Sequence, residues 1–246
     1  MKIILTGADG FIGHHAAIEL ATQNHEIIAI DNGSQNTLNA WHRHIISERK
    51  ALLLEAGIES IFIDCRNKDA LKHILTEQRP DVVIHLAAIP AMELANSNPA
   101  SAFENNVQST FHILDTIREQ KIDAHLIFFS SSTVYGNFLK SSVSENDLLN
   151  PIGIYEATKV CGETLLKSFS NLSGIDYTIF RPSALYGARC VNNRVSQLLI
   201  ERALTGKSLK LFGGGNEELD FTHVDDVVQG IVLAVSNREQ SRNETF

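Results

Sequence analysis

The 246-residue chain has few cysteines, few prolines and no long apolar segment. Cys65, Cys161 and Cys190 lie far apart without a Cys-x-x-Cys spacing, which excludes a disulfide framework and favours the reduced thiols of a cytoplasmic protein. No segment approaches the roughly 20 apolar residues that span a bilayer, so no membrane partner is expected. The apolar start of the chain ends at Gly7, which is too short for a signal peptide.

The chain also lacks an excess of positive charge. Its formal net charge is −8, which argues against a nucleic-acid partner because a polyanion is normally bound by a basic face. The ten histidines have no cysteine or carboxylate set near them at metal-ligand spacing, so no metal site is expected. A hydrophobic content of 43% is enough for one large domain, or for a domain with a smaller lobe.

Short apolar runs alternate with longer amphipathic segments over the first 180 residues. The apolar runs predict buried strands at Lys2–Leu5, Glu26–Ile30, Ser60–Ile63, Val82–Leu86, Leu126–Phe129 and Thr178–Phe180. The amphipathic segments predict helices at Phe11–Gln23, Leu38–Ala56, Lys68–Gln78, Pro99–Glu119 and Ile154–Ser173. Such alternation is typical of βαβ units, so we predict an α/β fold with a doubly wound parallel sheet.

After Pro182 this rhythm changes. The pattern there predicts helices at Val195–Thr205 and Val224–Val235, with a short strand at Leu209–Phe212 and a glycine turn at 213–215 between them. We therefore expect a first domain over 1–181 and a smaller C-terminal lobe over 182–246, in which 220–237 could pack back on the first domain.

Gly7, Gly10 and Gly13 follow the first predicted strand and open the first predicted helix. Such glycines permit a tight turn, let the backbone approach a pyrophosphate, and let helix and strand pack closely. The helix N-terminus then offers N–H groups to the phosphates. The spacing departs from the Gly-x-Gly-x-x-Gly fingerprint, and an ordinary strand–turn–helix with incidental glycines is the alternative.

Asp31 ends the second predicted strand, where a carboxylate can accept hydrogen bonds from the ribose hydroxyls of a dinucleotide. A carboxylate there would repel a ribose phosphate, and no Arg or Lys lies between Asp31 and Trp41, which favours NAD over NADP. The alternative is a turn residue, because Asp31 is followed by Asn32, Gly33 and Ser34.

Tyr155 and Lys159 lie four residues apart in a predicted helix and so share one face. A neighbouring cation lowers the pKa of a tyrosine, which makes it a usable general base near neutral pH. Ser131 follows a predicted strand at the same sheet edge, where its hydroxyl can bind the substrate oxygen. The alternatives are a solvated helix face for the pair, and a loop-stabilising role for the serine.

Together these motifs resemble the extended short-chain dehydrogenase/reductase family, in its NAD-dependent epimerase/dehydratase group, which includes UDP-galactose 4-epimerase. The matching segments are TGADGFIG at 6–13, DN at 31–32, Asp64, HLAA at 85–88, NNV at 105–107, SSSTVYG at 130–136, YEATK at 155–159, RPSALYG at 181–187 and DFTHVDD at 220–226. The resemblance implies a Rossmann-like NAD-binding domain over 1–181 and a substrate-binding lobe over 182–246.

The resemblance also implies which residues carry the function. Ser131, Tyr155 and Lys159 would form the catalytic set, with Ser131 and Tyr155 touching a nucleotide-sugar substrate. The residues implied to line NAD are Gly7, Gly10, Phe11, Ile12, Gly13, Asp31, Asn32, Asp64, Cys65, Leu86, Ala87, Asn106, Tyr155, Lys159 and Pro182. Ser132 and Thr133 carry no acid where related dehydratases and decarboxylases place one, which favours epimerisation.

Two positions depart from the family pattern. Ala184 stands where members often carry a substrate-contacting Asn, and Leu219 where they often carry a diphosphate-binding Arg. The segment 181–210 has a net charge of +5, so we hypothesise that Arg189 or Arg194 holds a substrate phosphate. A solvated helix face is the alternative.

Other functions stay open at this point. A net dehydrogenase or reductase acting on a small alcohol or ketone would use the same fold, and Ala184 and Leu219 support it. A catalytically idle NAD-binding protein is the third hypothesis, supported only by a substrate lobe that is short for the family. The stripe of Phe103, Val107, Phe111 and Leu114 packs either on the sheet or in a homodimer, which the resemblance implies.

Overall fold

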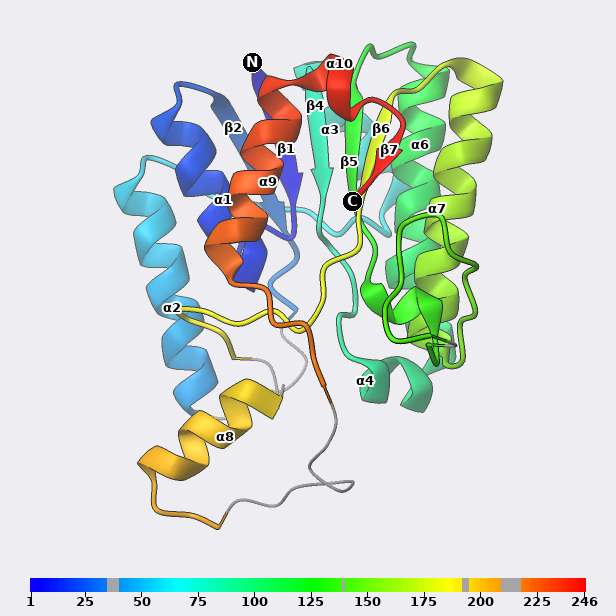
Figure 1. Ribbon diagram of the computed structural model, residues 1–246. Helices are drawn as coiled ribbons and strands as arrows, with labels where there is room; N and C mark the ends of the chain where they lie inside the picture. Colours follow the sequence, from blue (N-terminus) through cyan, green and yellow to red (C-terminus); the bar gives the residue numbers. More distant parts are fainter. Residues whose placement is uncertain (35–39, 139, 192–194, 209–217) are drawn as a thin grey trace.

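The computed structural model describes residues 1–34, 40–138, 140–191, 195–208 and 218–246. Its centre is a parallel sheet of seven strands in the order β3-β2-β1-β4-β5-β6-β7, with helices on both faces (Figure 1). The strands are β1 Lys2–Thr6, β2 Glu26–Asp31, β3 Ile61–Phe62, β4 Val82–His85, β5 His125–Phe129, β6 Tyr177–Phe180 and β7 Glu244–Thr245. The prediction of a doubly wound α/β fold is confirmed.

The predicted helices are found in the expected order, one of them interrupted, and the short helices α4 and α10 were not predicted. The segment predicted as a single helix over Pro99–Glu119 is divided into α5, a π-helical turn over Phe103–Gln108, and α6. The helices are α1 Phe11–Thr22, α2 Ala40–Glu55, α3 Lys68–Gln78, α4 Met92–Ser97, α5 Pro99–Ala102, α6 Ser109–Glu119, α7 Ile154–Ser173, α8 Val195–Leu204, α9 Val224–Ser236 and α10 Arg238–Ser241, with a 3₁₀ turn over Ser132–Tyr135. The strand predicted at Leu209–Phe212 lies outside the described residues.

Alternate residues of each central strand enter opposite hydrophobic cores. Ile3 and Leu5 of β1 pack with α1 and α9 on one face, whereas Ile4 packs with α3, α6 and α7 on the other. The interior residues of β1, β4 and β5 are all apolar, because a parallel sheet covered on both faces has no solvent side. The carboxyl ends of these strands therefore meet at a single edge.

The C-terminal segment joins the central sheet. Helix α9 packs against α1 (Figure 1), and β7 pairs with β6 in parallel through Thr178 opposite Glu244. The N-cap of α9 is His223, whose ring accepts a hydrogen bond from the Asp225 N–H. Asp225 lies inside the first turn, where its carboxylate faces the positive end of the helix dipole.

Helix α8 differs from the other long helices because none of its residues is buried. It lies at the far end of the molecule from the N-terminus, below α2 in the view of Figure 1. Within the described ranges, none of the helices combines the length and apolar character that a membrane span requires.

Three buried histidines make the fold sensitive to acid. Burial is the main cause that lowers the pKa of His14 and His85 to about 3 and that of His125 to about 4, from an ordinary 6.5. Below pH 6.5 the unfolded chain therefore binds protons that the folded protein excludes. We expect stability to be fully present above pH 6.5 and to fall between pH 6.5 and 5, by up to about 1.4 kcal/mol per pH unit for each histidine.

Denaturant unfolding of the protein across this range measures the slope. His125→Gln should make the slope smaller, because one of the groups that resist protonation in the folded state is removed, whereas substitution of the exposed His73 by Gln should not change it. A free energy of unfolding that stays level from pH 6.5 to 5 would contradict the assignment of neutral buried rings.

Candidate active site

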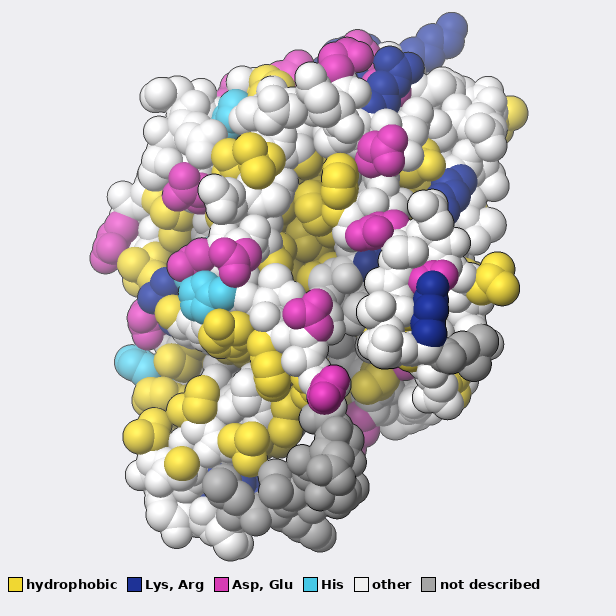
Figure 2. All heavy atoms as spheres, in the orientation of Figure 1, with side chains coloured by type: hydrophobic (Ala, Val, Ile, Leu, Met, Phe, Trp, Pro, Cys, Tyr) yellow, Lys and Arg dark blue, Asp and Glu magenta, His cyan; other side chains and the backbone are white. Residues whose placement is uncertain are grey.

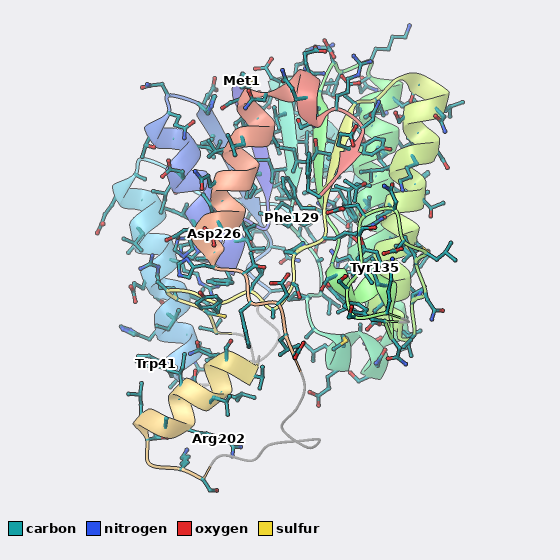
Figure 3. The ribbon with its side chains drawn as sticks, viewed as in Figure 1. Met1, Trp41, Phe129, Tyr135, Arg202 and Asp226 are labelled. Atoms are coloured by element: carbon teal, nitrogen blue, oxygen red, sulfur yellow. The ribbon has the colours of Figure 1, made fainter. Side chains whose placement is uncertain are left out.

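A cleft of about 1710 Å³ opens at the carboxyl ends of the central strands. The space-filling view shows a hollow in the middle of this face, with hydrophobic side chains in its depth (Figure 2). Phe129, the last residue of β5, lies between Asp226 of α9 and Tyr135 of the 3₁₀ turn (Figure 3), and all three line the cleft. Ligands bind at this edge in doubly wound sheets.

The glycine-rich turn forms one wall of the cleft. Gly7 has a φ of +73°, and a Cβ added to it would lie 2.8 Å from the Ala87 nitrogen. A Cβ on Gly13 would overlap the Gly7 carbonyl, so helix and turn approach as closely as their backbones allow. No described side chain caps α1 at Gly10, which leaves the N–H groups of its first turn open to an anion. This cradle suits the diphosphate of a dinucleotide.

Asp31 lies at the end of β2, where both of its carboxylate oxygens are held by backbone. Oδ2 accepts a hydrogen bond from the Asp9 N–H (3.1 Å), and Oδ1 accepts one from the Gly33 N–H (2.8 Å). Burial, and after it the neighbouring Asp9 carboxylate, raises the pKa of Asp31. Asp31 therefore stabilises its turn and also lines the cleft. The two interpretations from the sequence, a ribose contact and a turn residue, are compatible.

Three polar residues beyond Asp31 continue this wall. The Asn32 amide donates a hydrogen bond to Asp64 Oδ2 (3.1 Å), and Arg66 donates to both oxygens of Asp64. The Arg66 hydrogen bonds are the main cause that lowers the pKa of Asp64 to about 2. Burial raises the pKa of the Cys65 thiol to about 12, so Cys65 lines the cleft as an unreactive apolar group.

Asn106 is not among the residues that line the cleft. Its buried side chain accepts a hydrogen bond from the Ile89 N–H (2.7 Å), and its amide donates to the Ile89 carbonyl and the Thr158 hydroxyl. The π-helical turn that carries Asn106 thus connects the loop after β4 to the first turns of α7. Its role in the structure is to support the cleft wall from behind, whereas the resemblance implied a contact with NAD.

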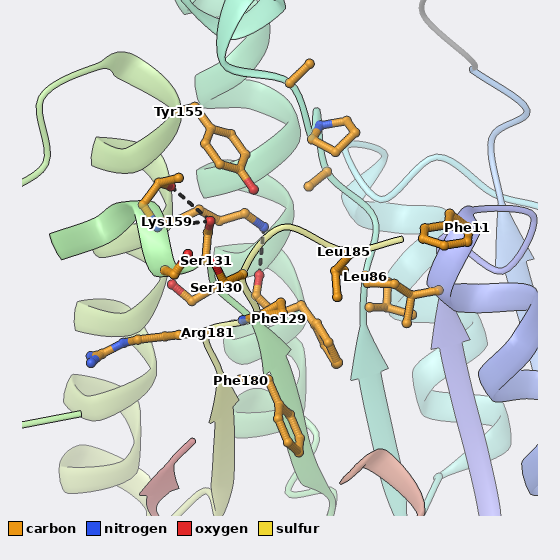
Figure 4. Close-up of a pocket in the computed structure, with 18 of the residues that line it drawn as sticks. Phe11, Leu86, Phe129, Ser130, Ser131, Tyr155, Lys159, Phe180, Arg181 and Leu185 are labelled. Atoms are coloured by element: carbon orange, nitrogen blue, oxygen red, sulfur yellow. Dashed lines mark hydrogen bonds between the residues drawn. The ribbon is translucent and has the colours of Figure 1, made fainter. Parts of the chain in front are cut away.

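Tyr155 and Lys159 project from one face of α7 toward the end of β5. Lys159 Nζ donates a hydrogen bond to the Phe129 carbonyl (2.7 Å) and lies 5.9 Å from the centre of the Tyr155 ring. Burial lowers the pKa of Lys159 to about 8, and the nearby Glu163 carboxylate opposes this effect. The Tyr155 phenol, the Lys159 amine and the Ser131 side chain face the same part of the cleft (Figure 4).

Ser131 is the N-cap of the 3₁₀ turn that follows β5. Its hydroxyl oxygen accepts hydrogen bonds from the Thr133 hydroxyl (2.9 Å) and the Thr133 N–H (3.3 Å). Because Ser131 acts as acceptor in both, its own proton can be donated to an oxygen in the cleft. Ser131 therefore stabilises its loop, as one of the two interpretations from the sequence holds. This is compatible with a hydrogen bond from Ser131 to a ligand.

A buried ion pair behind Ser131 was not predicted from the sequence. Arg181 donates to both oxygens of Glu163 (2.9 and 2.6 Å) and to the Tyr135 hydroxyl (2.7 Å), and Ser130 donates to Glu163 (2.6 Å). Glu163 lies one helical turn beyond Lys159, and Arg181 directly follows β6. Their position beside the predicted catalytic residues is the signal that could have identified them.

The basic segment does not present its described cations to the cleft. Arg189 is absent from the described lining because its side chain turns toward His14 and Glu48, and Arg202 donates to the Ser208 carbonyl. Arg181 lines the cleft, but its charge is paired with Glu163. Arg194 lies outside the described residues, so a phosphate contact there is a prediction only.

The remaining predicted residues lie in the cleft wall. These lining residues are Phe11, Ile12, Leu86, Ala87 and Pro182, together with both family departures, Ala184 and Leu219. Of the 15 residues implied to line NAD, the structure brings all except Asn106 to one cleft.

Comparison with known proteins identifies the family. Residues 3–246 match the model of the NAD dependent epimerase/dehydratase family. The chain is 35% identical to the uncharacterized UDP-glucose epimerase YtcB of Bacillus subtilis strain 168, over 96% of this chain and 72% of YtcB.

Solved structures agree with this result. The crystal structure of Bacillus cereus UDP-glucuronic acid 4-epimerase, in complex with UDP-glucuronic acid and NAD, has a TM-score of 0.89 and 31% identity, covering 100% of this chain and 76% of that one. The Thermotoga maritima UDP-glucose 4-epimerase with UDP-glucose has a TM-score of 0.87 and 27% identity, with the same coverage. The chain therefore belongs to the NAD-dependent epimerase/dehydratase family.

Proposed function

We propose that the protein is an NAD-dependent epimerase of a nucleotide-diphosphate sugar, acting at the sugar 4-position. The observation that carries this proposal is the meeting of Tyr155, Lys159 and Ser131 in the cleft that the glycine-rich turn borders. The similarity to epimerases of UDP-glucose and UDP-glucuronic acid supports a nucleotide sugar as substrate.

Each residue of this set has one chemical task. Tyr155 removes the proton from the sugar hydroxyl that is oxidised, and returns it when the hydroxyl is restored on the other face of the ring. Lys159 stabilises the phenolate by its positive charge. Ser131 donates a hydrogen bond to the sugar oxygen and so holds it near Tyr155. When bound, NAD would supply the group that accepts the hydride from the sugar carbon and gives it back.

Two neighbouring residues favour epimerisation over loss of a substituent. Ser132 and Thr133 follow Ser131 along the cleft wall, and neither can act as the acid that elimination of water requires. All substrate atoms are then retained. The cleft of about 1710 Å³ leaves room for a keto-sugar to present either face.

We assign NAD and the substrate to different parts of the chain. The Rossmann-like domain over 1–181 would bind NAD through 13 of the predicted residues that line the cleft, with Asn106 supporting them, and Pro182 of the following segment would complete the set. The segment 182–246 would supply the substrate side, although its part over 224–246 also packs on the sheet domain.

A net dehydrogenase or reductase is the second candidate. Ala184 and Leu219 line the cleft where family members often carry polar contacts to a nucleotide sugar. Such an enzyme would accumulate NADH with an alcohol substrate, whereas an epimerase leaves the ratio of NAD to NADH unchanged.

Tyr155→Phe tests the catalytic assignment. We expect turnover of the nucleotide sugar to fall by about 10²- to 10⁴-fold, because the general base is lost, while the affinity for NAD stays within about twofold. Ser131→Ala should lower turnover less, and Tyr177→Phe, which alters a tyrosine at the start of β6, serves as the matched control. Wild-type turnover by Tyr155→Phe would reject the assignment.

We also propose that the protein is a cytoplasmic homodimer that pairs through α6 and α7. Phe111 and Leu172 are 38% and 74% exposed on these helices, and Phe111 contacts Phe169 across them. Of the predicted stripe, Phe103 is exposed as well, whereas Val107 and Leu114 belong to the core.

Substitution of Phe111 by Arg should convert the dimer to a monomer, because a charge would be buried in an apolar interface. Light scattering after gel filtration measures the mass, and Leu204→Arg on α8 is the control. A wild-type protein that is monomeric at micromolar concentration would contradict the dimer.

A further inference from the structure

Arg49 of α2 is the largest of the fully buried side chains in the described part of the molecule, and it is charged. Burial lowers its pKa to about 10, so it is still protonated at neutral pH. Its Nη1 donates to the Asp9 carbonyl (3.2 Å), and its Nε and Nη2 both donate to the Arg189 carbonyl (3.2 and 2.6 Å). A side chain that only filled space would not need this charge, which is costly to bury.

The Asp9 and Arg189 carbonyls belong to two segments that are far apart in the sequence. Asp9 lies inside the glycine-rich turn, and its N–H donates to Asp31. Arg189 lies 180 residues later in the sequence, in a segment whose neighbours Leu185 and Val191 line the cleft. Arg49 itself lines the cleft as well. The guanidinium group therefore connects the dinucleotide-binding turn to the segment 188–190.

Two histidines of α1 hold the same segment. His14 Nδ1 donates to the Gly10 carbonyl, and its Nε2 accepts a hydrogen bond from Arg189 Nε (3.1 Å). This arrangement requires a neutral ring, in agreement with a pKa of about 3. His15 Nε2 donates to the Ala188 carbonyl (3.1 Å). Segment 188–190 is thus fastened to the first turn of α1 at residues 188 and 189.

Charged residues beside this connection form ion pairs. Lys50 forms an ion pair with Asp9 (3.1 Å), and Arg189 forms one with Glu48 (3.6 Å). The acceptors of Arg49 among the described residues are backbone oxygens, and the Asp31 and Asp9 carboxylates act on its charge as neighbours. A dinucleotide diphosphate at the adjacent turn would receive the attraction of this charge.

We propose that Arg49 is a cofactor-retention residue, which fastens segment 188–190 to the glycine-rich turn and so slows the release of NAD. Binding of NAD would fix the conformation of the glycine-rich turn, and through the Arg49 hydrogen bonds it would also fix segment 188–190. Segment 188–190 would then keep the glycine-rich turn from opening. This inference concerns NAD binding alone and does not depend on the sugar chemistry proposed above.

The experiment measures release of NAD from the purified full-length protein. Wild type, Arg49→Met and Arg49→Lys are loaded with NAD, freed of excess nucleotide, and chased with NADH, whose fluorescence reports exchange. We expect release from Arg49→Met to be faster by about tenfold or more, since hydrogen bonds from a charged group are lost. Arg49→Lys keeps the charge but cannot reach both carbonyls as a fork, and should give an intermediate rate.

Amide hydrogen exchange distinguishes the proposed role of Arg49 from a role in packing alone. In the wild type, NAD should protect the amides of residues 188–191, and this protection should be absent in Arg49→Met and reduced in Arg49→Lys. Arg202→Met, which removes a guanidinium from α8, should behave as wild type in both measurements.

The outcomes separate the proposal from simple destabilisation. A folded Arg49→Met with a lower melting temperature but wild-type release and protection would overturn it. If Arg49→Met does not fold, Arg49→Lys decides: wild-type release with wild-type protection of 188–191 overturns the proposal, and faster release with reduced protection supports it.

Discussion

The hydrogen bond from Lys159 to the Phe129 carbonyl fixes the geometry on which the rest of the site depends. It joins the helix that carries Tyr155 to the strand end from which Ser131 follows. A buried ammonium has few places to satisfy its donors, so α7 can take only a narrow range of positions against β5. Close packing adds to this constraint, because Gly162 leaves no room for a methyl group beside the Phe128 ring.

Further buried charged side chains hold the cleft wall in the same manner, through hydrogen bonds to neighbouring segments. Each lies in the cleft wall or directly behind it and binds backbone or another buried group, as Glu163 does with Arg181 and Ser130. Arg49 does the same at the dinucleotide end, through the carbonyls of Asp9 and Arg189. Such groups add little net stability in general, but they specify which segments meet. The two ends of the cleft are thus held by different buried cations.

Most of the fold could be predicted from the sequence because its strands and helices have strong, separate periods. All six predicted strands and the long helices in the described residues are found, and α3 and α7 have the predicted bounds. Strand β7 was missed because two residues have no period, and the π-helical turn because its amphipathic pattern continues that of α5 and α6. Contacts between segments distant in the sequence, such as Arg49 with the residue-189 carbonyl, leave no periodic signal at all.

We propose that Tyr155, Lys159 and Ser131 act on a nucleotide sugar that is oxidised and restored within one cleft. Incubation of the NAD-loaded protein with UDP-glucose or UDP-glucuronic acid deuterated at C4, followed by NMR of the products, tests it most directly. The account predicts a mixture of the two 4-epimers that retains deuterium at C4, with no net formation of NADH. Accumulation of NADH with an oxidised sugar, or no conversion of either substrate by a folded, NAD-bound protein, would contradict it.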